Sequence, residues 1–158
     1  MTRLHIPIPL RWGDLDAYGH INNVETLRLV EEARVRAFWH ATGDRHGDEL
    51  PTAVLELNAE SAVWSLVART EIEYLLPMPY TSAPIDVEVW LGRLGGASIE
   101  VCFELHSPLG VTPRLLYARA ATTIVTVDAA SGRPTRFPRH LTEAWAPYRE
   151  DPIAFTRR

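Results

Sequence analysis

The amino-acid sequence predicts an α+β fold in which one long helix is wrapped by a curved antiparallel sheet of about five strands. Residues 22–41 have the periodicity of an amphipathic helix. The segments after them alternate apolar and polar side chains and are joined by short turns, which favours antiparallel neighbours. The length of 158 residues fits one domain, 1–158.

A first strand is expected over residues 3–11, where apolar and polar side chains alternate. Pro7 and Pro9 favour an edge position, because proline has no N–H to donate to a neighbouring strand. A polar loop is expected from Trp12 to Gly19.

The helix is expected over residues 22–41, with Asn22 or Asn23 capping its first turn. Twenty residues would span roughly 30 Å. One face gathers the apolar residues Val24, Leu27, Val30, Val35, Ala37, Phe38 and Ala41. Glu31 and Arg34 fall on that same face, which indicates a mutually satisfied buried or interfacial pair. The opposite face carries charges spaced for ion pairs, namely Glu25, Arg28, Glu32 and Arg36.

The rest of the chain is expected to be mainly β. The predicted strands are 53–57, 63–76, 85–94, 97–106 and 115–127. Gly95 and Gly96 indicate a hairpin turn between two of them. The inward faces of those two strands are predicted to carry Ile85, Val87, Val89, Leu91, Ile99, Val101, Phe103 and Leu105. Residues 139–158 are expected to form a loose tail.

The composition is unusual because all 16 basic residues are Arg. A chain without Lys has no Schiff base, no pyridoxal phosphate anchor and no Walker A lysine. The net charge of −4 argues against a nucleic-acid partner. The charge is uneven, since residues 1–110 hold 8 Arg and 16 acids while residues 111–158 hold 8 Arg and 4 acids.

The cysteine count and the hydropathy restrict the possible metal sites, partners and cellular compartment. A single Cys, Cys102, forbids an internal disulfide and a cysteine-based zinc site, and we expect it to be a packed thiol. No run of 18 apolar residues is present, so we expect no membrane partner. With no recognisable signal peptide, the expected compartment is the cytoplasm.

The segment from Trp12 to Asn23 joins the first strand to the helix and concentrates the candidate chemistry. It contains two carboxylates, one His, two Asn and two Gly. Unpaired N–H groups at a helix start can polarise a carbonyl and stabilise an oxyanion. A carboxylate just before them could act as nucleophile or general base. The alternative interpretation is a capped helix that follows a polar turn.

This segment, RWGDLDAYGHINN over residues 11–23, is followed by EEAR over residues 31–34. Together they closely resemble the acyl-CoA thioesterases of the hotdog fold, in the 4-hydroxybenzoyl-CoA thioesterase-like group. The resemblance extends more weakly over residues 3–138. It implies hydrolysis of an acyl thioester, on coenzyme A or acyl carrier protein, to a free acid and a thiol. It also implies a homodimer or dimer of dimers with active sites at a subunit interface, and no cofactor or metal.

The resemblance assigns roles to individual residues of the loop. Asp16 matches the catalytic Asp, as nucleophile or as base for water. Asn23 matches the helix-start position near the thioester carbonyl, and His20 belongs to the same motif and orients the loop. We expect Tyr18, Gly19 and Ile21 to contact the substrate, and N–H groups around Ile21–Asn23 to hold the oxyanion.

The nucleotide end of coenzyme A needs cations or N–H groups. The candidates are Arg93, Gly95, Gly96 and Ser98 at the hairpin, with Arg133, Arg136 and Arg139 further along. The sequence departs from the pattern at Thr26, where relatives usually carry Tyr, and this departure concerns the acyl pocket.

Several alternatives remain open. Asp14 is the fallback catalyst, because it points the same way as Asp16 if the segment is extended. His40, Asp44, His46 and Asp48 form a polar group without a recognised metal-ligand pattern, so no metal site is expected there. A hotdog protein that binds acyl-CoA or acyl carrier protein without turnover is the second functional hypothesis, and a hydratase on the same fold ranks last.

Overall fold

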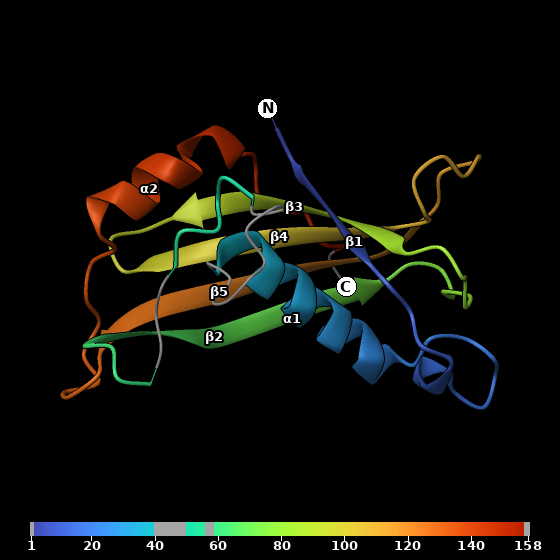
Figure 1. Ribbon diagram of the computed structural model, residues 1–158, viewed down its shortest axis with the longest axis horizontal. Coiled ribbons are helices and arrows are strands. Elements are labelled where there is room, and N and C mark those ends of the chain that lie inside the picture. Colours follow the sequence, from blue (N-terminus) through green and yellow to red (C-terminus); the bar gives the residue numbers. More distant parts are fainter. Residues whose placement is uncertain (1, 40–49, 56–58, 157–158) are drawn as a thin grey trace, which may run out of the picture.

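A computed structural model describes residues 2–39, 50–55 and 59–156. Figure 1 shows α1 lying across one face of a five-stranded antiparallel sheet with the order β1-β3-β4-β5-β2. The elements are β1 (Leu4–Ile8), the 3₁₀ turn η1 (Trp12–Asp14), α1 (Asn23–Phe38), β2 (Val63–Tyr74), β3 (Ile85–Leu94), β4 (Ser98–His106), β5 (Leu116–Asp128), α2 (Arg139–Trp145) and the 3₁₀ turn η2 (Ala146–Tyr148). The α+β fold with an antiparallel sheet is confirmed.

The core lies between α1 and the sheet face that α1 covers. The predicted inward residues of β3 and β4 are all buried there, and Phe103 and Leu105 are fully enclosed. The period-two alternation therefore predicted this face correctly, since successive side chains of a strand point to opposite sides. The predicted hairpin is also confirmed, because the Gly95 N–H donates to the Ser98 carbonyl at 2.8 Å.

The long helix begins as predicted and ends earlier. The side chain of Asn22 accepts the N–H two residues further on and caps α1. The predicted end at residue 41 is wrong, because α1 ends at Phe38. The Phe38 carbonyl accepts the N–H of Leu55 at 2.9 Å, and Trp39 forms a lone bridge with Leu55. The chain leaves the helix in order to pair with this distant segment.

The face of α1 that meets the sheet differs from the predicted one. Its buried residues are Thr26, Leu29, Val30, Ala33, Arg34, Ala37 and Phe38. Val24, Leu27 and Val35 are instead exposed. The apolar residues of this helix extend round more than one face, and only the sheet decides which face is covered. Arg34 is buried and pairs with Glu31, which is half exposed. The predicted pair therefore forms, but only its arginine is buried.

The charged face of α1 is confirmed. Arg28 pairs with Glu25 at 2.6 Å and with Glu32 at 3.4 Å, and Arg36 also pairs with Glu32. The predicted strand 53–57 is not a strand over residues 53–55, where Leu55 makes only its bridge to Trp39. Residues 56 and 57 lie outside the described part of the chain.

The expectation of a loose tail is wrong for residues 139–148, which form α2 and η2. Leu141 and Trp145 are buried in the core. The Trp145 ring packs edge-on against Phe38 and Phe137, with centroids 5.7 Å apart in both pairs. Its indole N–H donates to the Thr52 carbonyl at 3.0 Å. An apolar pair four residues apart is too short a signal to predict such a helix from sequence.

The segment after η2 runs along the outer face of the sheet. The Glu150 N–H donates to the Leu91 carbonyl at 2.9 Å, and the Trp90 indole N–H donates to the Asp151 carbonyl at 3.0 Å. The side chains of Ile153 and Phe155 then pack on the apolar group Trp90, Cys102 and Ala121. Burial raises the pKa of the Cys102 thiol to about 11, so this cysteine is a packed neutral thiol, as predicted.

Within the described part of the chain, neither helix is long and apolar enough to cross a membrane.

The packing of Trp145 leads to a stability prediction. Trp145→Ala removes a core indole and its hydrogen bond, so the free energy of unfolding should fall by about 3–5 kcal/mol in urea titrations. Trp12→Ala is the matched control, because that ring is 74% exposed, and it should change the same quantity by less than about 1 kcal/mol. Equal effects of the two substitutions would show that α2 is not part of the cooperative core.

Candidate active site

The loop between η1 and α1 is a tight turn built around Asp16. One carboxylate oxygen of Asp16, Oδ1, accepts the N–H groups of Tyr18 at 2.8 Å and His20 at 3.2 Å. The backbone N–H of Asp16 donates to the His20 carbonyl at 2.8 Å. Gly19 has φ +77°, a conformation that favours glycine and closes the turn. Among the described residues, none donates to the second oxygen, Oδ2.

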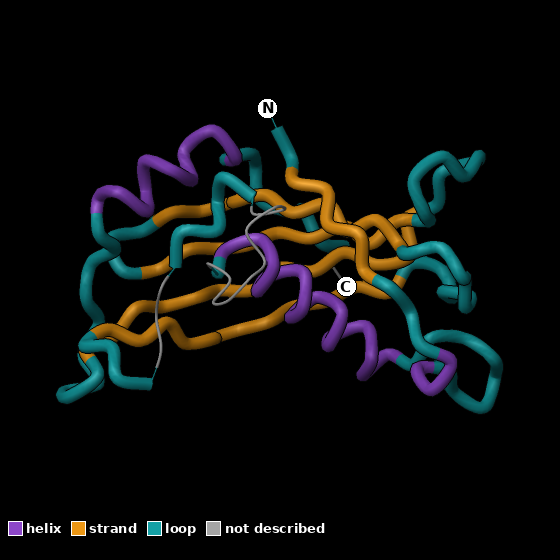
Figure 2. Tube along the Cα trace, in the orientation of Figure 1, coloured by secondary structure: helices purple, strands orange, loops and turns teal. Residues whose placement is uncertain are grey.

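The same turn is attached to a segment far along the chain. The Ile21 N–H donates to the Met78 carbonyl at 2.8 Å, and His20 forms a lone bridge with Pro79. The carboxylate of Asp16 is therefore held beside the residues that follow β2. Figure 2 shows that this loop and the loop after β2 lie at one end of the sheet.

Asp14, two residues before Asp16, is fully buried and bound to arginines. One of its oxygens accepts the side-chain N–H of Arg11 at 3.0 Å. The other accepts the backbone N–H of Arg11 at 2.8 Å and the guanidinium of Arg28 at 3.0 Å. The backbone carbonyl of Asp14 accepts the Asn22 N–H at 2.8 Å. These bonds join η1 to the first turns of α1, so Asp14 positions the loop.

The pKa of Asp14 reflects these contacts. Burial alone would raise it, but the hydrogen bonds from Arg11 and the positive charge of Arg28 outweigh burial and hold the pKa below the ordinary value for Asp. Both carboxylate oxygens are occupied, so Asp14 is not available as the fallback catalyst. Of these two carboxylates, Asp16 is the one with an oxygen that no described residue bonds.

The start of α1 leaves a free donor beside Asp16. The N–H of Ile21 is bonded to Met78 and the N–H of Asn22 is bonded to Asp14. Within the described part of the chain, no acceptor meets the N–H of Asn23. An unpaired N–H in the first turn of a helix carries positive partial charge and attracts an anion. Among the N–H groups expected to hold an oxyanion, the N–H of Asn23 is therefore the one available to a ligand.

A cavity of about 350 Å³ opens beside these groups. Its lining residues are Asp16, His20, Ile21, Asn23, Thr26, Tyr74, Leu75, Leu76, Pro77, Met78, Tyr117 and Ala118. The structure thus brings together Asp16, His20, Ile21 and Asn23, which the sequence identified. The residues from 74 to 78 and the two from β5 were missed, because only strand pairing brings them to the loop.

Other predicted site residues lie away from the cavity. The side chain of Tyr18 is 86% exposed, and neither Tyr18 nor Gly19 lines the cavity. Both instead shape the turn that holds Asp16.

The hairpin residues lie at the other end of the sheet. Ile85 at the start of β3 pairs with Ile8, close to the Asp16 loop, and β3 then runs ten residues to Leu94. A strand of that length spans roughly 30 Å. The structure does not bring Arg93, Gly95, Gly96 and Ser98 to the cavity of the same chain. It does bring the hairpin to the basic C-terminal segment, where the Phe137 N–H donates to the Gly96 carbonyl at 3.2 Å.

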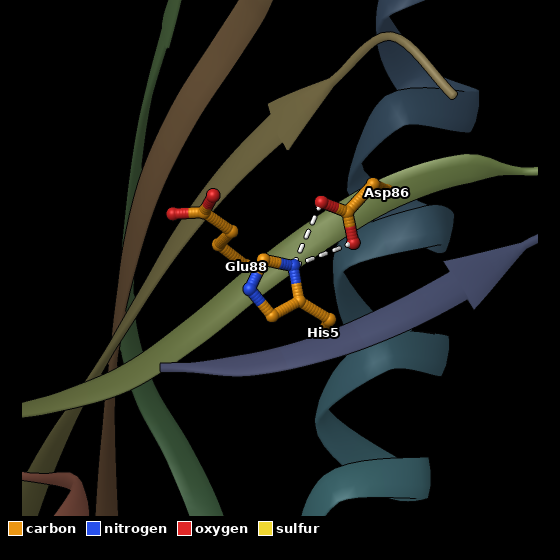
Figure 3. Close-up of side chains that lie close together, drawn as sticks. All are labelled: His5, Asp86 and Glu88. Carbon is orange, nitrogen blue, oxygen red and sulfur yellow. Dashed lines mark hydrogen bonds and ion pairs between the residues drawn. The ribbon is translucent and has the colours of Figure 1, made fainter. Parts of the chain in front are cut away.

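The outer face of the sheet carries a cluster of possible metal ligands. Figure 3 shows the His5 ring turned toward the Asp86 carboxylate with Glu88 close by, and His5 Nδ1 lies 2.9 Å from Asp86 Oδ2. Glu104 and His106 extend the cluster on β4. The sequence alone indicates no partner for His5 or His106. Their neighbours on β3 and β4 could not be known before the strands were paired.

Two arginines already bind the carboxylates of this cluster. Arg114 donates to Asp86 at 2.5 Å and to Glu88 at 2.7 Å. Arg3 donates to Glu88 at 2.9 Å and to Glu104 at 2.7 Å. A cation would have to displace these guanidinium groups, so the cluster is best described as a salt-bridge network that ties strands together. The polar group His40, Asp44, His46 and Asp48 lies outside the described residues.

Comparison with known proteins places the chain among thioesterase-like sequences. Residues 10–145 match the profile described as "Thioesterase-like superfamily". A protein of Pseudomonas aeruginosa described as "a putative Thioesterase" is 30% identical, with a TM-score of 0.69, and the match covers 90% of this chain and 98% of that one. Among curated proteins, no sequence matches.

Two further solved structures have a similar fold. One is described as "a putative acyl-CoA thioesterase" from Xanthomonas campestris, with 25% identity, a TM-score of 0.62, and coverage of 86% of this chain and 100% of that one. The other is the Dynemicin thioesterase, with 16% identity, a TM-score of 0.76, and coverage of 97% and 100%. At that identity the second likeness concerns the fold alone.

The role of Asp14 is testable through pH. Asp14→Asn should lower the free energy of unfolding at pH 7 by about 2 kcal/mol, because charged hydrogen bonds are lost. The folded-state pKa of Asp14 is below its unfolded value, which is about 4. The contribution is therefore complete above about pH 4 and disappears as pH falls through the folded-state pKa. Urea titrations should therefore show a smaller difference between the two proteins at pH 3 than at pH 7.

Asp151→Asn provides the control, because Asp151 is exposed and should shift stability by no more than about 0.5 kcal/mol at each pH. A constant difference between the Asp14 variant and the original protein at both pH values would refute an ionised, depressed Asp14.

Proposed function

Because the chain belongs to the thioesterase-like superfamily, we propose that it hydrolyses the thioester of an acyl-CoA or acyl-carrier-protein substrate to a free acid and a thiol. The similarity to the Xanthomonas campestris protein described as "a putative acyl-CoA thioesterase" supports coenzyme A as the carrier. We also infer that the helix and sheet form a hotdog fold. Membership of the 4-hydroxybenzoyl-CoA thioesterase-like group stays a prediction.

One observation carries this proposal. Within the described part of the chain, one carboxylate oxygen of Asp16 has no hydrogen-bond donor and the N–H of Asn23 has no acceptor, and both residues line the same cavity. A thioester carbonyl placed between them would meet a base or nucleophile on one side. Its oxygen would meet a positive partial charge on the other.

The chemistry follows from those two groups. The Asp16 carboxylate removes a proton from a water whose oxygen attacks the thioester carbon, or it attacks that carbon itself. The negative charge that develops on the carbonyl oxygen is stabilised by the Asn23 N–H and the helix start. The carbon–sulfur bond then breaks and the thiolate leaves. A mixed anhydride formed by direct attack is hydrolysed by water. Both routes need a deprotonated Asp16.

His20 has a more limited role in this scheme. Its backbone N–H and carbonyl hold Asp16, while its exposed ring makes no hydrogen bond within the described part of the chain. The ring lines the cavity, so it can contact the substrate, whereas orientation of the catalytic carboxylate comes from the backbone.

Replacement of Asp16 tests the activity. Asp16→Asn should lower kcat by about 100-fold or more on a panel of acyl-CoA substrates, because the amide is neither base nor nucleophile. Free thiol is the readout. Glu143→Gln, on α2 and paired with Arg139, makes the same chemical change away from the cavity and should leave kcat unchanged.

Two results would count against the proposal in different ways. Binding of acyl-CoA without turnover by the unaltered protein would favour the non-catalytic alternative. Turnover that survives Asp16→Asn would move catalysis to another residue.

We also propose that the working form is a homodimer joined along β2. This strand has 12 residues and pairs with β5 on one side, while within the described chain no strand pairs with its other side. An unpaired edge of that length invites pairing with another chain. Apolar side chains are exposed on this strand, among them Trp64, Leu66 and Val67. A second copy would cover them.

An antiparallel β2–β2 pairing would also explain the remote basic residues. Val63 at the start of β2 pairs with Asp128, which begins the basic segment, while Tyr74 at its end lines the cavity. Antiparallel pairing sets the start of one β2 beside the end of the other. The basic segment and hairpin of the second copy would then approach the substrate's phosphates.

Substitution on the β2 edge tests the dimer. Val67→Glu should shift the protein from dimer to monomer in size-exclusion chromatography with light scattering, because it places a charge in an apolar contact. Val111→Glu is the control, since that loop side chain is equally exposed, at 47% against 49% for Val67, and the dimer should persist. A monomer before any substitution would overturn this part of the proposal.

A further inference from the structure

A β-bulge in β5 aims Tyr117 into the cavity. Across the sheet, His106 pairs with Leu116 and Leu105 pairs with Ala118, so Tyr117 is one extra residue with no partner on β4. Strict alternation would set Tyr117 opposite to Ala118. Both residues instead belong to the core on the α1 side and line the cavity. Bulges re-aim side chains in this way and are frequent next to active sites.

The phenol of Tyr117 is buried but its hydroxyl is unused. The residue is 4% exposed. Within the described chain, the hydroxyl makes no hydrogen bond. In the described part of the chain, some polar side-chain atoms are sealed from solvent and have no hydrogen-bond partner. They are Ser65 Oγ, Glu100 Oε1 and His106 Nδ1. The Tyr117 hydroxyl is not among them, so it keeps an opening to the cavity. Burial also raises the pKa of Tyr117, which keeps its proton available to donate.

The neighbouring hydroxyls of the cavity are already committed. Tyr74 donates to the Asn23 carbonyl at 2.9 Å, and Thr26 donates to the Asn22 carbonyl at 3.3 Å. The Tyr117 hydroxyl, which opens to the cavity, is therefore free to donate to a ligand oxygen there. Leu75, Leu76 and Met78 add apolar side chains to the same cavity.

We propose that Tyr117 is a specificity-determining residue that donates a hydrogen bond to an oxygen on the acyl group, so that the preferred substrates are oxygenated acyl thioesters such as 3-oxoacyl or 3-hydroxyacyl chains. This inference rests on the proposed hydrolysis at Asp16. The thioester oxygen meets the Asn23 N–H on the loop wall, whereas Tyr117 lies on the sheet wall. The acyl group is the end of the substrate that enters furthest, and Tyr117 is nearly enclosed.

Matched substrates test the proposal. The ratio of kcat/KM for 3-oxohexanoyl-CoA to that for hexanoyl-CoA should exceed one in the unaltered protein and fall by about 3- to 10-fold in Tyr117→Phe. Tyr74→Phe is the control, since it removes a hydroxyl that binds protein, and it should lower both rates without moving the ratio. The same ratio is measured for binding in the Asp16→Asn background by calorimetry.

The turnover and binding measurements together distinguish failure of the proposed subsite from failure of the proposed hydrolysis. One outcome is that the unaltered protein binds the oxo substrate preferentially without turning it over, and that Tyr117→Phe removes this preference. This result supports the subsite and overturns hydrolysis. Turnover with a ratio that Tyr117→Phe does not change overturns the subsite and leaves hydrolysis standing. An equal loss for both substrates also overturns it, because the hydroxyl would then contact the coenzyme or the thioester.

Discussion

The buried carboxylate of Asp14 is the interaction on which the geometry of the candidate site depends. A charge with no exposed surface needs several partners, and here they come from Arg11 before the loop and Arg28 within α1. The bonds tie η1 to the helix from both ends of the loop. The intervening residues have to turn back on themselves, and that turn sets Asp16 beside the start of α1. Arg11 and Arg28 thereby support the site without facing its cavity.

The second wall of the site depends on two departures from regular β structure. The bonds from the loop to Met78 and the bridge to Pro79 stop the chain from continuing straight after β2. The bulge at Tyr117 lets its carbonyl accept the N–H groups of Leu75 and Leu76, at 2.8 and 3.1 Å. A regular ladder would offer that carbonyl one partner. The irregularities therefore hold the sheet wall against the loop wall.

The sequence predicted what is encoded locally. The alternation in β3 and the two glycines of the hairpin each depend on a few adjacent residues, and both were correct. The helix end was missed because the carbonyl of Phe38 bonds to the N–H of Leu55, a contact between residues far apart in the sequence. The covered face of α1 was misplaced because apolar residues lie on more than one side of it. Contacts between distant segments also limit what can be predicted of the site. The motif around Asp16 was recognisable in the sequence. The bulge at Tyr117 was not, because a bulge is defined only by the pairing of β5 with β4.

The absence of Lys makes the distribution of Arg decisive for a phosphate-bearing substrate. Near the cavity, Arg11 and Arg28 are each bound to Asp14 and Glu25, so their charges are compensated. Among the described residues, Arg93, Arg133 and Arg136 form no salt bridge, and they lie toward the far end of the sheet, near Leu94 and Asp128.

A strand length of roughly 30 Å separates these arginines from Asp16 in one chain, which is too far for a guanidinium to reach. In the dimer that we propose, antiparallel pairing of two β2 edges would reverse one sheet relative to the other and carry the uncompensated cations of each copy toward the cavity of its neighbour. A single chain therefore has the carboxylate and the helix start at one end and these arginines at the other, which is why we propose that the catalytic unit is the pair.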